Sequence, residues 1–256
     1  MIKFFRKIRQ KMLTENKFSK YLMYAIGEII LVVIGILIAL KINNWNELRK
    51  TNNNQEKYLK LLKVESLKNL KEVNRYKDLV TNMHSSQLTV MNLIDANHDT
   101  ISESYLSKTF VNIFGSSYSF DYENSTLSEL KNSGELKNIR NDSLRKYLTA
   151  LEPLVLKIQK VEQDVEISLD EVTEYLQPRI SFRKMLIESD TEIYFEIPNS
   201  TKPRKSIIPI LENEEFENRL LTYTLVTGNL NKNHYPKLEN HLKKIIDIIG
   251  KELNNK

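Results

Sequence analysis

An uninterrupted apolar run near the start of the chain is the feature that most limits its fold. Residues 21–40 read YLMYAIGEIILVVIGILIAL and hold one charged side chain, Glu28. As a helix, residues 21–42 span about 33 Å, which is enough for a hydrocarbon core of about 30 Å. An amphipathic core helix of a soluble protein would show a polar stripe, and a cleaved signal peptide would need small residues where 38–41 are mostly bulky. The run therefore predicts an uncleaved transmembrane signal anchor at residues 21–42.

The charge of the chain is concentrated before this run. The whole chain has 38 Lys and Arg against 33 Asp and Glu, a net charge of +5, and residues 1–20 alone carry +6. The remainder is close to neutral, which removes support for nucleic-acid binding. Because Lys and Arg near a span stay on the cytoplasmic side, residues 1–20 are predicted to be a basic cytoplasmic tail. The protein is then a single-pass protein of the bacterial inner membrane, with most of its chain in the periplasm.

Two features inside the predicted span suggest contacts with other helices. Small or short side chains recur every four residues at Gly27, Leu31, Gly35 and Ala39, and small residues let helix backbones approach. This stripe favours self-association or packing against another membrane protein, although Gly is also common in isolated spans. Glu28 either faces a partner or a proton path, or snorkels toward the headgroups.

The chain has few of the residue patterns that chemistry requires. It lacks Cys, which excludes disulfides and thiolate zinc sites, and its four histidines have no metal-ligand spacing. No glycine-rich phosphate loop or nucleophile elbow is present. We therefore expect no catalytic residues, no cofactor and no metal. A hydrolase would need an acid/base pair that only folding could bring together.

Residues 27–47, GEIILVVIGILIALKINNWNE, resemble the N-terminal signature of a family of small single-span membrane proteins from Gram-negative bacteria. This family is classified as a domain of unknown function. A second part of its pattern, a Leu-Lys-x-Ser-Gly-x-Leu run before an Asn-capped helix, is similar to residues 130–136 and 141–145. The resemblance covers about a quarter of the chain and implies no activity, substrate or catalytic residue.

The rest of the chain is predominantly helical in pattern. Residues 43–54 read as a polar hinge, and residues 55–256 as an extramembrane helical bundle. Its predicted helices cover residues 55–95, 102–111, 126–132, 141–177, 214–229 and 236–249. Thr126 and Glu129 form a capping-box pattern, and Gly134 sits where a helix end needs positive φ. The predicted fold class is all-α, an antiparallel bundle in which residues 191–197 and 206–210 can form a small β-hairpin.

One cluster of aromatic residues lies in and around a Ser-rich loop: Tyr105, Phe110, Phe114, Tyr118, Phe120 and Tyr122. These side chains either line a ligand or partner surface or plug the end of the bundle. We expect a membrane-anchored, non-enzymatic bundle that binds a partner protein or ligand in the periplasm. The alternative is an accessory subunit of an inner-membrane transport or motor assembly that contacts a neighbouring span through Glu28.

Overall fold

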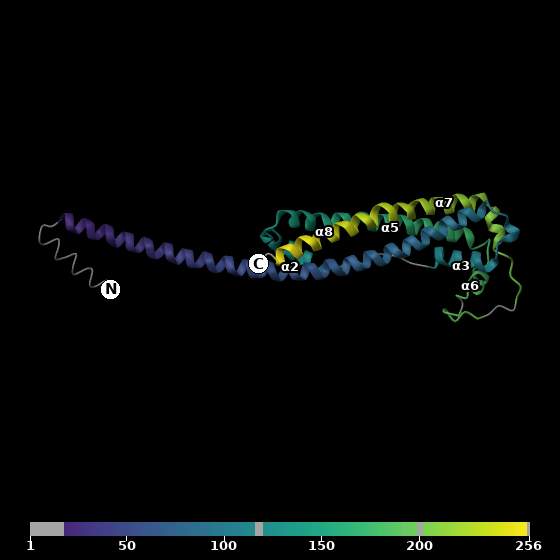
Figure 1. The fold of residues 1–256 in the computed structure, drawn as a ribbon, viewed down its shortest axis with the longest axis horizontal. Helices are drawn as coiled ribbons and strands as arrows, with labels where there is room; N and C mark the ends of the chain where they lie inside the picture. The colour runs from purple at the N-terminus through teal and green to yellow at the C-terminus, as the bar shows by residue number, and fades with distance from the viewer. Residues whose placement is uncertain (1–17, 116–119, 192, 199–201, 255–256) are drawn as a thin grey trace. The chain divides into compact units, whose positions relative to one another are not determined.

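The computed structural model describes residues 18–115, 120–191, 193–198 and 202–254, and over these residues its regular elements are all helices (Figure 1). The prediction of an all-α fold is confirmed. The chain divides into two compact units, Met1–Lys57 and Tyr58–Lys256. The N-terminal 17 residues, most of the predicted basic tail, lie outside the described residues.

Helix α2 (Phe18–Ile94) is the only described element of the first unit and continues into the second. In the described part of the chain it is the one helix long and apolar enough to cross a membrane, by length and composition, and none of its apolar window is buried. Residues 43–54, expected to be a hinge, are helical in the structure. They contain neither Pro nor Gly, and Asn disfavours a helix by only about 0.7 kcal/mol relative to Ala.

The second unit is built around α5 (Asp142–Leu176), which packs against α7 (Glu214–Asn229) and α8 (Tyr235–Asn254). At one end Asn141 Nδ2 donates to Glu252 Oε1 at 2.9 Å, and at the other Tyr175 OH donates to Asn213 Oδ1 at 2.7 Å. The start of α5 therefore meets the end of α8, and the two helices run antiparallel.

The part of α2 in this unit also runs antiparallel to α7 and α8. Lys77 pairs with Glu239 at 2.7 Å, and further along α2 Gln87 Nε2 donates to Thr227 Oγ1 at 3.2 Å. Helices α2 and α5 consequently point the same way, so the chain must return along the bundle between them. It does so through four short elements: η1 (His98–Thr100), α3 (Glu103–Phe114), α4 (Ser125–Asn132) and η2 (Glu135–Asn138).

A π-helix, η4 (Leu230–His234), joins α7 to α8, so the two helices expected from the sequence are continuous. Pro236 explains its position. Proline has no amide hydrogen and its ring crowds the carbonyl four residues earlier, and a wider π turn relieves both conflicts. Pro153, expected to kink or end its helix, lies inside α5, and the helix continues past it.

Carboxylates attach the short connecting elements to the bundle. Glu65 on α2 is buried and accepts bonds from Thr126 N at 2.6 Å, Leu127 N at 3.3 Å and Ser125 Oγ at 3.3 Å. These donors form the first turn of α4, whose own N-cap residue, Asn124, makes no capping bond through its side chain. The capping box predicted at Thr126 is therefore wrong, because a carboxylate from α2 takes its place. Glu103 does the same for η3 (Ile208–Glu212) by accepting from Ile207 N at 2.7 Å.

The predicted β-hairpin is also wrong. Residues 193–196 form turns, with bonds from Tyr194 N to Thr191 O and from Glu196 N to Ile193 O, and Glu196 has a φ of 53°. Two of the three alternating apolar residues face no core: Ile193 is 75% exposed and Phe195 59%, while Ile197 is half-buried. Tyr194, between the first two, is 83% exposed. A strand period stabilises a sheet only when one of its faces is buried.

This exposed turn should be the first site that a protease cuts. Brief digestion with chymotrypsin is expected to cleave after Tyr194 or Phe195, because buried aromatic residues such as Phe110 and Phe120 are protected. The two fragments should stay associated, since α7 and α8 pack against α5. Mass spectrometry of timed digests checks this, with Tyr194→Ser/Phe195→Ser as the control that should delay cleavage. A first cut within α5 or α8 would contradict it.

Candidate functional site

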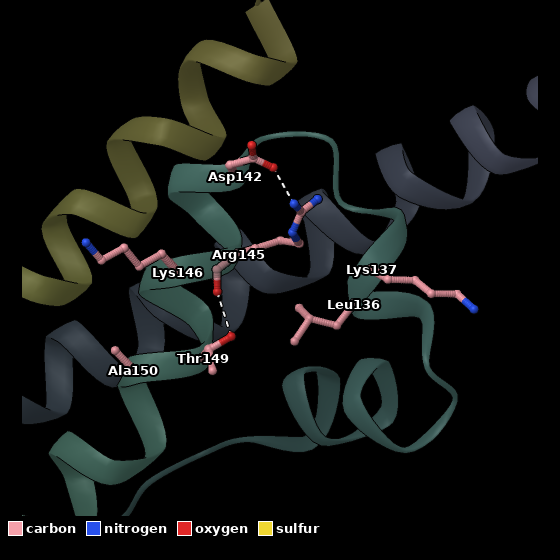
Figure 2. A pocket seen from close by; sticks show the side chains of 7 residues that line it. All are labelled: Leu136, Lys137, Asp142, Arg145, Lys146, Thr149 and Ala150. Atoms are coloured by element: carbon pink, nitrogen blue, oxygen red, sulfur yellow. Dashed lines mark hydrogen bonds and ion pairs between the residues drawn. The ribbon is translucent and has the colours of Figure 1, made fainter.

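A groove of about 620 Å³ lies on the second unit, between η2 and the first turns of α5 (Figure 2). Its lining from α5 follows one helical face, at positions i, i+3, i+4, i+7 and i+8. The residues that line it are Leu136, Lys137, Asp142, Arg145, Lys146, Thr149 and Ala150.

Local backbone rules place η2 against α5. Gly134 has a φ of 72°, as expected for the residue that ends α4 and starts the turn into η2. Ile139 is buried and anchors the end of that turn. Asn141 then caps α5, since its Oδ1 accepts from Leu144 N at 2.9 Å, as the sequence predicted.

Arg145 holds the two walls of the groove together. Its guanidinium donates to Ile139 O at 2.5 Å and pairs with Asp142 on the first turn of α5. These bonds use two of the five N–H donors that an arginine carries. Thr149, which also lines the groove, donates through Oγ1 to Arg145 O at 2.8 Å.

The groove combines an apolar floor with a cationic rim. Leu136 and Ala150 supply apolar surface, while the ammonium groups of Lys137 and Lys146 extend outward on opposite sides (Figure 2). With Arg145 paired to Asp142, the net charge of the lining is about +2, and the N-terminus of α5 adds the positive end of a helix dipole. Such a lining attracts anions. Its one carboxylate is engaged, and it holds no histidine or other base.

The residues predicted within the span lie in the first unit. Gly27, Leu31, Gly35 and Ala39 are all exposed on α2, and a Cβ added at either glycine would meet nothing within 4 Å. The face is therefore open to a neighbouring helix. Glu28 is half-buried.

The predicted aromatic cluster does not form one surface. Phe110 and Phe120 are fully buried in the core, and Phe114 packs edge-on against Phe110 with ring centroids 5.5 Å apart. Tyr122 is half-buried and packs against the core, whereas Tyr105 is exposed. Tyr118 lies outside the described residues. The placement of the buried members matches the alternative in which these rings fill the bundle.

The groove residues were not predicted from the sequence, because residue spacing alone does not show which side chains line a groove. The sequence does contain a pattern at this place. Residues 130–136 and 141–145, which carry the second part of the family resemblance, include the turn and the helix start that form the walls of the groove. The sequence pattern does not show that η2 folds back toward α5. This placement depends on Gly134 and on the bond from Arg145 to Ile139 O.

A second polar cluster is buried in the core. Glu162 on α5 is only 4% exposed; it accepts from Tyr235 OH at 2.6 Å and from Phe120 N at 3.2 Å. Burial raises the pKa of Glu162 above its ordinary value, and its two hydrogen bonds oppose that shift. Burial and the neighbouring Glu162 raise the pKa of Tyr235, which therefore remains a donor.

The raised pKa of Glu162 predicts a pH-dependent stability. A carboxyl group that binds its proton more tightly in the folded state stabilises the fold below its unfolded pKa, and this contribution is lost as pH rises through the folded pKa. The Glu162→Gln variant should therefore lose less free energy of unfolding than the wild type between pH 5 and pH 8. Urea denaturation across that range checks this. Equal pH slopes would contradict it, because the depressed pKa values of Glu239 and Asp247 act in both proteins alike.

Taken together, these features define a class: an all-α bundle that follows one exposed apolar helix and carries a basic groove where α5 begins. The chain belongs to DUF6090, a family of unknown function whose model matches residues 28–172. The match covers more than half of the chain and includes every residue that lines the groove. The predicted resemblance to a domain-of-unknown-function family is confirmed. No curated protein and no solved structure matches the chain.

Proposed function

We propose that this protein is a single-span, membrane-anchored and non-enzymatic bundle that recruits a partner from its extramembrane unit. One observation carries the membrane anchor: the apolar window of α2 has no buried residue, while the second unit has a core of its own. The basic groove is what supports the recruitment of a partner. Apolar surface on this scale is not left in water, and a bilayer is the solvent that suits it. The buried core of the bundle lies within the second unit.

The proposed orientation rests on charge. Residues 1–20 carry +6 and precede the apolar run, which favours a cytoplasmic N-terminus and a periplasmic second unit in a bacterial inner membrane. The open face of Gly27 and Gly35 suits close packing against a second span, from another copy or another protein.

The partner is expected to bind at the groove. A compact aliphatic diazirine amino acid, much smaller than tryptophan, in place of Ala150, which is exposed and lines the groove, should give one discrete protein adduct in native membranes. The same probe in place of Lys160, an exposed position of α5 outside the groove, should not give that adduct. The absence of any protein adduct from Ala150, or identical adducts from both positions, would contradict the proposal.

A further inference from the structure

The charge of the groove limits what it can bind. Lys137, Lys146 and Arg145 face one carboxylate, Asp142, and that carboxylate is already paired with Arg145. An occupant with negative charge would therefore be attracted from both sides of the groove and from the start of α5. A neutral occupant would gain only the apolar contacts.

The dimensions of the groove also limit what it can bind. Its α5 wall runs from Asp142 to Ala150, which is about 12 Å of helix at 1.5 Å per residue. An extended chain advances about 3.3 Å per residue, so three or four residues would match this length. Only two elements line the groove, which leaves it open along its length, as a chain segment requires and an enclosed small molecule does not.

The apolar floor distinguishes the occupant from a simple anion. Leu136 and Ala150 both line the groove, and Leu136, on the η2 side, is already half-buried against the core. A phosphate ion or a lipid headgroup would contact the cations and leave this floor uncovered. An apolar side chain flanked by carboxylates would use both surfaces.

We propose that the groove binds a short, extended acidic peptide segment of a partner protein, with an apolar side chain on Leu136 and carboxylates near Lys137 and Lys146. This inference rests on the proposed function, because it names the chemistry of the recruited partner.

The test uses the full chain in a non-ionic detergent and a fluorescent peptide, acetyl-Gly-Asp-Leu-Glu-Leu-Gly, followed by fluorescence anisotropy. The peptide in which Asn and Gln replace the two acids should bind at least ten-fold more weakly. Lys137→Glu/Lys146→Glu should weaken binding of the acidic peptide at least ten-fold. The matched control Lys157→Glu/Lys160→Glu, which makes the same charge change on exposed positions of α5, should change binding less than two-fold.

A second variant removes the space rather than the charge. Ala150→Trp, at an exposed position, should block the groove and weaken binding at least ten-fold without lowering the thermal midpoint of unfolding. Equal affinity for the acidic and the amide peptide would overturn the inference, as would equal losses in the two charge variants. So would displacement of the peptide by millimolar inorganic phosphate, or binding of phosphatidylglycerol vesicles that Lys137→Glu/Lys146→Glu alone abolishes.

The peptide experiment and the crosslinking experiment test the two proposals separately. A protein adduct from Ala150 together with no acidic preference would leave the proposed recruitment standing and reject the acidic peptide. Acidic peptide binding without any adduct in membranes would reject the recruitment role.

Discussion

Two arginines placed in the middle of the apolar run, Val32→Arg and Ile36→Arg, should release the protein from membranes. Each arginine at the centre of a span opposes insertion by about 2.5–3.5 kcal/mol, so the pair should oppose it by about 5–7 kcal/mol. That corresponds to a shift of at least about 1,000-fold in the equilibrium between inserted and released chain. Both positions are exposed on α2, so the bundle loses no core contact.

Carbonate extraction of membranes measures this effect. The wild type and the control Val32→Leu/Ile36→Leu should remain in the pellet, and the arginine variant should appear in the supernatant. Its second unit should unfold at the same temperature as that of the wild type, because its core lies in residues of Tyr58–Lys256. An arginine variant that resists extraction would count against a membrane span.

Glu65→Leu should produce the largest loss of stability among single changes to the polar groups of the bundle. The substitution removes an acceptor from Thr126 N, Leu127 N and Ser125 Oγ, and it removes negative charge from the N-terminus of α4. Unsatisfied buried donors destabilise by about 1–3 kcal/mol each, and loss of a cap adds to this, so we expect a total of about 3 kcal/mol.

Urea denaturation in mild detergent measures this free energy. Glu65→Gln keeps one acceptor oxygen and should lose about half as much as the leucine variant, whereas Glu166→Leu, at an exposed position of α5, should change stability by less than about 0.5 kcal/mol. Equal effects at Glu65 and Glu166 would show that the carboxylate does not hold α4.

The local features of this fold could be predicted because their signals are local. Helices were expected over residues 141–177 and 214–229, and the asparagine at each start, Asn141 or Asn213, accepts a bond from the amide three residues later. Gly134 was expected to take positive φ, and it does. The apolar stripes gave the extents of α5 and α7 to within a few residues, since a helical period is a property of the segment itself.

The features that the sequence pattern did not predict correctly depend on distant parts of the chain. Glu65 and Glu162 lie on otherwise apolar stripes, where the pattern gives no reason for a carboxylate, and their donors come from segments 42 to 73 residues away. The strand period of residues 191–197 predicted a hairpin because spacing cannot show whether a core faces it. The groove needed the same information, since its two walls are brought together by the turn after Gly134 and by the bond from Arg145 to Ile139 O.

The central claim, a membrane anchor that places the second unit in the periplasm, is tested most directly by single-cysteine labelling. The chain has no cysteine of its own, so Thr14→Cys and Lys160→Cys each report one position. In cells with a permeabilised outer membrane, a membrane-impermeant maleimide should label Lys160→Cys and should label Thr14→Cys only after the inner membrane is disrupted. Labelling of Thr14→Cys in intact cells, with Lys160→Cys protected, would contradict the account.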